Sequence, residues 1–145
     1  MNLQVDNLES IENNYNPTIK NKAEKKIKIL IADDYKPLCE TLKNILNRYE
    51  ELEVIGLAHT DQEEIEKIEE LKPNVVITDI KRNNQYTGLD IVKQYENKED
   101  SPYFFVISSA ADERKLNSNP KIIGFMSKPF LNYDKIVEEI LKVYL

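Results

Sequence analysis

The chain has 145 residues, of which 41% are hydrophobic and 32% are charged, and its formal net charge is -6. This length and composition are typical of one globular domain with a substantial core. The acidic balance argues against direct nucleic-acid binding, since no basic excess is available to displace counterions from phosphates. Cys39 is the only cysteine, so no internal disulfide can form. No run is long and apolar enough to span a membrane, and the first residues do not resemble a secretion signal. We therefore expect a cytoplasmic protein without membrane insertion.

The first segment, residues 1–25, is polar and rich in asparagine, with Pro17 in its middle. This composition predicts a poorly ordered N-terminal extension. A short amphipathic turn that docks on a partner is the alternative, because Leu8, Ile11 and Tyr15 fall at helical spacing. We place one domain after it, over residues 26–145.

From residue 26 onward, apolar β-branched runs alternate with segments of helical periodicity. The runs predict five strands, at 27–32, 54–58, 75–79, 103–108 and 122–126. The periodic segments predict helices from Pro37 to about Tyr49, from an N-cap at Asp61 to before Pro73, from Leu89 to Tyr95, and after an N-cap at Asn132. Weak periodicity at 111–120 predicts a fourth helix of at most a turn or two. Such alternation predicts a three-layer, doubly wound α/β domain with a parallel sheet.

The run from Val75 to Asp79 suits a strand buried on both faces that ends abruptly in a carboxylate. In open α/β sheets, ligands bind at the carboxyl ends of the strands, so Asp79 is a candidate site residue. The alternative is an ordinary turn residue that bonds its own backbone. Residues at the other strand ends decide between the two.

Four of the predicted strands are followed by polar residues: Asp33 and Asp34, Asp79, Ser109, and Lys128. If the first and third strands are neighbours, three carboxylates converge, and their repulsion requires a cation. Lys128 supplies one positive charge, and Mg²⁺ prefers such clustered carboxylates with room for water. The Ser109 hydroxyl and the Lys128 ammonium are donors suited to phosphoryl oxygens. The pattern predicts phosphoryl chemistry at a carboxylate, with metal and lysine neutralising the developing charge.

With these residues at its strand ends, the segment 26–145 resembles the response-regulator receiver domains of two-component signalling. The matching pieces are Asp33-Asp34, Asp79, Ser109-Ala110, Phe125 and Lys128-Pro129-Phe130, each at or near a predicted strand end. The resemblance implies a five-stranded parallel sheet in the flavodoxin-like order 2-1-3-4-5. It also implies a signalling switch that assists its own phosphorylation and dephosphorylation, and not an enzyme acting on other substrates.

By this resemblance, Asp79 takes a phosphoryl group from a phosphohistidine on a sensor histidine kinase or phosphotransfer protein. Mg²⁺ would be held by Asp33, Asp34, Asp79 and the backbone carbonyl of Lys81.

The resemblance also implies roles for residues at or near the ends of the fourth and fifth predicted strands. Lys128 would pair with Asp79 and then with the phosphoryl oxygens. Ser109 and Phe125 would form the switch that changes a surface for an unidentified downstream protein.

The chain departs from the family pattern after the acceptor. Gly88 lies nine residues beyond Asp79, where the family has eight, and Asn83 stands where proline is usual, so we expect the loop 80–88 to bulge. Ser109 replaces the commoner threonine and keeps the hydroxyl, whereas Phe125 replaces a tyrosine and loses it. The interval from Ser109 to Lys128 is short, so we expect a remodelled face around the fourth helix.

Two other classes of protein are weighed against this interpretation. One is a receiver-like adaptor that works without phosphorylation. The other is a flavin or nucleotide binder, which needs a phosphate-cradling loop after the first strand; the acids in Asp33-Asp34-Tyr35-Lys36-Pro37 would repel phosphate. We interpret Cys39 as a buried filler and His59 as a surface or capping residue.

Overall fold

A computed structural model describes residues 25–109, 119–128 and 132–144. The elements are, in chain order, β1 (Ile27–Ala32), α2 (Lys36–Leu46), β2 (Leu52–Ala58), α3 (Asp61–Leu71), β3 (Val75–Asp79), α4 (Thr87–Gln94), β4 (Tyr103–Ser108), β5 (Ile122–Ser127) and α6 (Tyr133–Tyr144). The predicted poor order of residues 1–25 and the predicted short fourth helix at 111–120 fall mainly on segments, 1–24 and 110–118, that lie outside the described residues.

The five strands form one parallel sheet in the order β2-β1-β3-β4-β5. This confirms the predicted three-layer α/β architecture and its strand order. Strands β1 and β3 are neighbours, with Ala32 paired to Thr78. Because both strands run in the same direction, the residues that follow them meet at one edge of the sheet.

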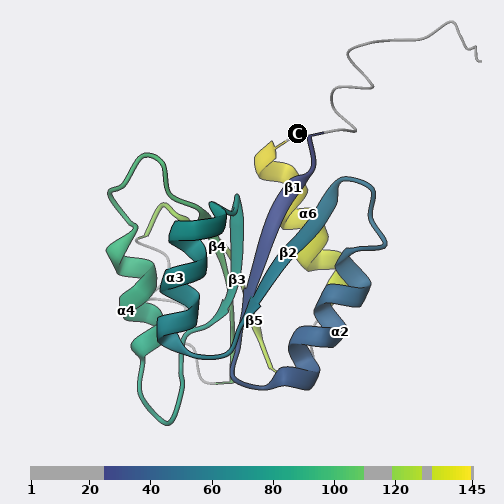
Figure 1. Ribbon diagram of the computed structural model, residues 1–145. Helices are drawn as coiled ribbons and strands as arrows, with labels where there is room; N and C mark the ends of the chain where they lie inside the picture. Colours follow the sequence, from purple (N-terminus) through teal and green to yellow (C-terminus); the bar gives the residue numbers. More distant parts are fainter. Residues whose placement is uncertain (1–24, 110–118, 129–131, 145) are drawn as a thin grey trace, which may run out of the picture.

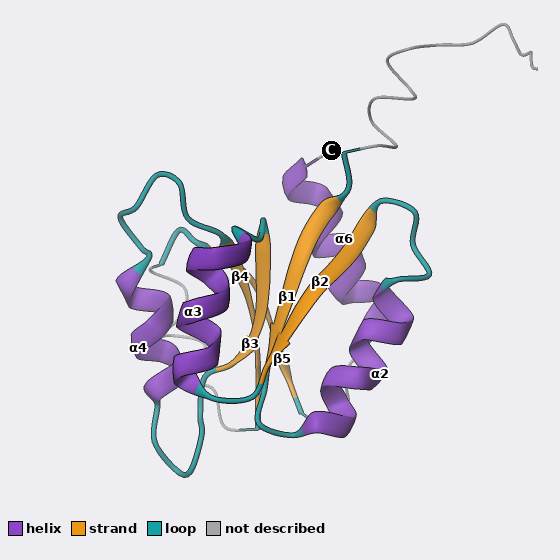
Figure 2. Cartoon of the chain, in the orientation of Figure 1, coloured by secondary structure: helices purple, strands orange, loops and turns teal. Residues whose placement is uncertain are grey.

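Helices α3 and α4 cover one face of the sheet, and α2 and α6 cover the other (Figures 1 and 2). Side chains of β1 alternate between the two layers: Ile29 and Ile31 pack with the α2 and α6 side, and Leu30 and Ala32 with the α3 and α4 side. All five residues of β3 are buried. A strand covered on both faces needs no polar positions, which explains its continuous apolar run.

Some element boundaries depart from the prediction. Helix α2 ends at Leu46, with Asn47 as its C-cap, although the apolar stripe continues to Tyr49. Strand β2 begins at Leu52, two residues before the predicted start. The N-cap of α3 is Thr60 and not the predicted Asp61, because Thr60 has the extended backbone of a cap and its hydroxyl accepts a bond from the Glu63 amide at 3.1 Å.

The predicted N-cap of α6 is confirmed. Asn132 Oδ1 accepts a bond from the Lys135 amide at 3.1 Å, as an N-cap does. Leu89, Val92 and Tyr95 are buried under the sheet. None of the described helices is long and apolar enough to cross a membrane.

Candidate functional site

Three carboxylates lie together at the carboxyl edge of the sheet. Asp33 and Asp34 follow β1, Asp79 ends β3, and one oxygen of each lies within 4.8 Å of the others. Asp33 and Asp79 are only 1% and 5% exposed, whereas Asp34 is exposed. The neighbouring positions of β1 and β3 bring the carboxylates together, as the sequence analysis required.

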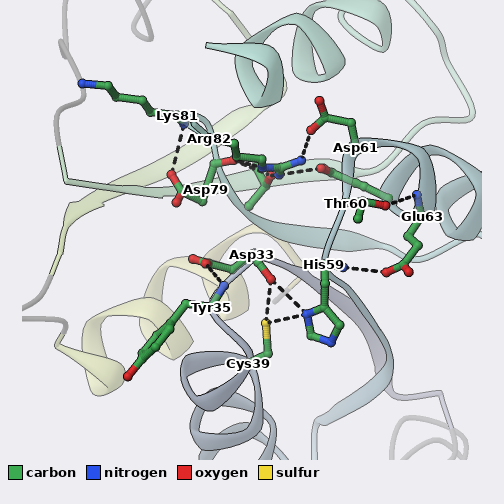
Figure 3. Close-up of polar contacts among 12 residues, drawn as sticks. Asp33, Tyr35, Cys39, His59, Thr60, Asp61, Glu63, Asp79, Lys81 and Arg82 are labelled. Atoms are coloured by element: carbon green, nitrogen blue, oxygen red, sulfur yellow. Dashed lines mark hydrogen bonds and ion pairs between the residues drawn. The ribbon is translucent and has the colours of Figure 1, made fainter. Parts of the chain in front are cut away.

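Asp33 and Asp79 are held in the same way. One oxygen of each accepts a backbone amide two residues on: Asp33 Oδ1 from Tyr35 at 2.8 Å, and Asp79 Oδ1 from Lys81 at 3.1 Å (Figure 3). These are the local bonds of an Asx turn, so Asp79 is a turn residue as well as a site candidate. Its second oxygen stays available for another partner.

That partner is Lys128, which follows β5. Its Nζ lies 2.8 Å from Asp33 Oδ2 and 3.1 Å from Asp79 Oδ2, and its backbone amide donates to the Ser108 carbonyl at 3.0 Å. Burial lowers the pKa of Lys128, but the bonds and charges of Asp33 and Asp79 outweigh that effect and raise the pKa above its ordinary value. Lys128 is therefore a fixed cation.

The charge balance and the donor set fit a hard divalent cation. Three carboxylates and one ammonium leave two negative charges at the cluster. The ligand atoms available are carboxylate oxygens, which suit Mg²⁺, and the exposed Asp34 leaves one side of the cluster open to water. Asp33, Asp34 and Asp79 are the residues that could hold such an ion.

The other predicted site residues lie at the same edge or next to it. Ser109 directly follows β4 and is exposed. Phe125, in β5, is half-buried and packs on the cluster of Ile80, Leu89 and Val106. Lys81 contributes its amide to Asp79, while its side chain points away from the carboxylates (Figure 3).

The sequence analysis missed Arg82, which is 7% exposed and central to the polar network (Figure 3). Its guanidinium lies 2.5 Å from Asp61 Oδ1 and 2.6 Å from Glu64 Oε1, and it donates to Thr78 Oγ1 at 2.8 Å. Its Nε donates to the backbone carbonyl of Asp79 at 3.0 Å. Arg82 thus joins the loop after β3 to α3 and to the end of β3.

One signal in the sequence pointed to this network. Glu64 lies one turn before Ile68 on the buried face of α3, and it is completely buried. A carboxylate on a buried helix face requires a cationic partner. Desolvation raises the pKa of Glu64 to about 7, although the charge of Arg82 opposes that rise.

The loop after Asp79 accommodates its extra residue in a tight turn. Arg82 and Gln85 form an antiparallel bridge, with backbone N to O distances of 2.7 and 2.9 Å. Between them, Asn83 and Asn84 have φ values of 52° and 62°. Asparagine tolerates this left-handed region better than most residues, so an Asn-Asn pair suits a two-residue turn. The predicted bulge is therefore a small hairpin.

Gly88 packs directly on the backbone of the acceptor. Its amide donates to the Ile80 carbonyl at 3.1 Å, and a Cβ at this position would lie 2.3 Å from the Asp79 carbonyl oxygen. Only glycine allows this close approach. The requirement for glycine near this point of the loop is thus a packing requirement, whatever the exact spacing from Asp79.

Cys39 and His59 both contact the backbone of Asp33. Cys39 is fully buried, and desolvation raises the pKa of its thiol to about 12, so it is an inert filler as interpreted from the sequence. His59 Nδ1 lies 3.0 Å from the Asp33 carbonyl oxygen, and the His59 amide donates to Glu63 Oε1 at 2.8 Å. His59 is half-buried, beside the first turn of α3.

The sequence is similar to a known protein family and to several characterised proteins. The family model described as "Response regulator receiver domain" matches residues 29–141. A protein-glutamate methylesterase/protein-glutamine glutaminase of Methanococcus maripaludis is 30% identical over 124 residues, 81% of this chain and 34% of that protein. The sensory transduction protein LytT of Bacillus anthracis is 29% identical over 119 residues, 80% of this chain and 46% of that protein. The chain thus spans less than half the length of these relatives.

Solved structures share the fold. The response regulator domain of Thermotoga maritima CheB has a TM-score of 0.64 at 26% identity, covering 81% of this chain and 92% of that one. A DNA-binding response regulator of the LuxR family from Staphylococcus aureus has a TM-score of 0.71 at 21% identity, covering 82% and 99%.

Proposed function

This chain belongs to the response regulator receiver family of two-component signalling, and from that premise we propose that Asp79 is its phospho-acceptor. The observation that carries the proposal is the cluster itself: three carboxylates within 4.8 Å, with Lys128 bonded to both Asp33 and Asp79. No other carboxylate of the cluster ends a buried strand while keeping contact with the lysine.

The proposed donor is a phosphohistidine on a sensor histidine kinase or phosphotransfer protein. An oxygen of the Asp79 carboxylate forms a bond to phosphorus as the bond from phosphorus to the histidine nitrogen breaks, and the electron pair of that bond stays on the histidine. The product is an acyl phosphate on Asp79 and an unphosphorylated histidine. Deprotonated Asp79 is the nucleophile, so no base is needed in this step.

The remaining residues would neutralise charge and position the reacting groups. Mg²⁺, held by Asp33, Asp34, Asp79 and the Lys81 carbonyl, would stabilise the negative charge of the transferred group when bound. The Lys128 ammonium, already 3.1 Å from Asp79 Oδ2, would turn to the phosphoryl oxygens.

The proposed switch consists of Ser109 and Phe125. The Ser109 hydroxyl, at the carboxyl end of β4, would donate to the phosphoryl group, and Phe125 on the adjacent β5 would move further inward. We propose a protein as the downstream partner and the cytoplasm as the location, where the single buried thiol of Cys39 stays reduced.

The test is phosphorylation by acetyl phosphate with Mg²⁺, read by intact mass. We expect the wild-type chain to gain one phosphate, the Asp79→Asn variant to gain none, and the matched control Asp100→Asn, at an exposed turn, to behave as wild type. A wild-type chain that gains no phosphate would contradict the proposal and favour the phosphorylation-independent adaptor. Equal labelling of Asp79→Asn would place the acceptor elsewhere.

A further inference from the structure

Arg82 holds the backbone of the acceptor from outside the carboxylate cluster. Its Nε donates to the Asp79 carbonyl at 3.0 Å, so it bonds the main chain of the acceptor and leaves the carboxylate free. Its other nitrogens reach Asp61 and Glu64 on α3. The strand end is therefore fastened to a helix of the adjacent layer.

The segment between these bonds is short. Lys81 lies directly before Arg82, and its amide is bonded to Asp79 Oδ1. On its other side, Arg82 begins the tight turn that closes on Gln85. The peptide of Lys81 is thus fixed at its amide by Asp79 and at its carbonyl end by an anchored arginine.

We propose that Arg82 is a positioning residue of the site, which fixes the Asp79 backbone and the Lys81 carbonyl in the geometry that binds the metal. The inference rests on the proposed function, in which these two residues take part in holding Mg²⁺. It assigns to Arg82 no contact with the metal or with the phosphoryl group.

A purely stabilising role explains this arrangement less well. Glu64 is completely buried, and its Oε2 has no hydrogen-bond partner among the described residues. A buried ion pair with an unsatisfied oxygen contributes little compared with apolar packing of the same volume. The planar guanidinium, in contrast, fixes several acceptors in one geometry, which a lysine ammonium cannot do. The contacts of Arg82 are therefore better explained by positioning of the Asp79 backbone than by stabilisation of the fold.

The test compares Mg²⁺ affinity in variants of the full chain, measured by isothermal titration calorimetry, with thermal unfolding as a check of folding. The test variant is Arg82→Gln combined with Glu64→Gln, which removes the buried charge pair together. The matched control is Glu64→Gln alone, which keeps the Arg82 bond to the Asp79 carbonyl. We expect the double variant to bind Mg²⁺ about 10 to 100 times more weakly than the control, as for other residues that orient metal ligands.

A second variant protects the test against a folding failure. Arg82→Lys keeps a cation beside Glu64 but lacks the planar fork, so we expect it to fold and to show weakened Mg²⁺ binding as well. A purely structural role would lower the melting temperature and leave the Mg²⁺ affinity of folded protein unchanged. An Mg²⁺ affinity within about twofold of Glu64→Gln for the double variant, and within about twofold of wild type for Arg82→Lys, would overturn the inference, because an orienting residue should change it about 10-fold.

The same samples separate this inference from the proposed function. Acetyl phosphate and intact mass are applied in parallel to wild type. A wild-type chain that binds Mg²⁺ but gains no phosphate contradicts the proposed function, while the affinity comparison still decides the role of Arg82. A wild-type chain that gains phosphate on Asp79, with unchanged affinity in the Arg82 variants, overturns the inference alone.

Discussion

Lys128 Nζ lies 3.1 Å from Asp79 Oδ2, although 49 positions separate the two residues in the sequence. The same ammonium lies 2.8 Å from Asp33 Oδ2, so one cation bridges the acids that follow β1 and end β3. Both acids belong to the carboxylate cluster that could hold a metal. Lys128 and a bound metal would therefore both neutralise the negative charge of the carboxylates.

Replacing Lys128 by methionine should strengthen metal binding and weaken the metal-free fold. Mg²⁺ affinity should rise by at least about tenfold, because a positive charge a few ångströms away no longer repels the ion. Without Mg²⁺ the free energy of unfolding should fall by about 1–3 kcal/mol, since two buried carboxylates lose a partner. Calorimetry and urea unfolding measure the two effects.

Lys135→Met is the matched control for this substitution. Lys135 is 49% exposed and, among the residues that the structure describes, forms ion pairs with Glu138 and Glu139 on its own helix, so its loss should change neither quantity by much. A Lys128→Met variant with unchanged or weaker Mg²⁺ binding would contradict the idea that Lys128 and Mg²⁺ neutralise the same carboxylates.

The buried Glu64 should make the stability of the protein depend on pH. Its pKa is about 7 in the folded protein, against an ordinary value of 4.5, so the folded state holds the proton more tightly than the unfolded state. The stabilising effect of that proton is complete below pH 4.5 and is lost as the pH rises through about 7. Relative to Glu64→Gln, wild type should lose up to about 3 kcal/mol over that interval. Urea unfolding at pH 5 and pH 8, without Mg²⁺, measures the difference in free energy of unfolding between wild type and Glu64→Gln. A difference that does not change with pH contradicts the prediction.

Gly88→Ala should destabilise the fold at the acceptor. The new Cβ would meet the Asp79 carbonyl oxygen at 2.3 Å and Ile80 Cα at 2.7 Å, and both are backbone atoms that cannot rotate away. We expect a loss of about 1–3 kcal/mol or more, as in overpacked cores. Gly56→Ala is the control, because its closest neighbour is the end of the Leu71 side chain at 3.0 Å. Equal losses at the two positions in thermal unfolding would contradict this packing role.

The Asn83-Asn84 turn should tolerate alanine poorly. Both residues have positive φ, a region in which asparagine is favoured over alanine because its short polar side chain can hydrogen-bond to the nearby backbone. Replacing either asparagine by alanine should therefore lower the free energy of unfolding by about 1 kcal/mol. Asn97→Ala, at an exposed position without positive φ, is the control, and an equal response there would be evidence against turn strain.

The sheet and its polar edge could be predicted from the sequence because their signals are local. β3 opens with three consecutive apolar residues because both of its faces are covered, and its carboxylate marks the strand end. Strand order then brings Asp33 and Asp79 together without any knowledge of side-chain packing.

The network behind the site could not be predicted in this way. Arg82, in the loop after β3, meets Glu64 of α3 across 18 positions, so the neighbours of either residue in the sequence do not identify the pair. A second bond of Arg82, to Asp61, bears on the wrong prediction of the α3 N-cap. Thr60 and Asp61 are both suitable capping types, but the Asp61 carboxylate is bonded to Arg82, which leaves Thr60 as the cap.

The most direct test of the central claim is chemical trapping of the phosphorylated residue. Borohydride reduces an acyl phosphate on aspartate to homoserine, so peptide mass mapping after treatment with acetyl phosphate and Mg²⁺ identifies the acceptor. We predict homoserine at position 79 and unchanged aspartate at 33 and 34. Homoserine at position 33 or 34, or no homoserine in a sample shown to carry phosphate, would contradict the assignment of Asp79 as the phospho-acceptor.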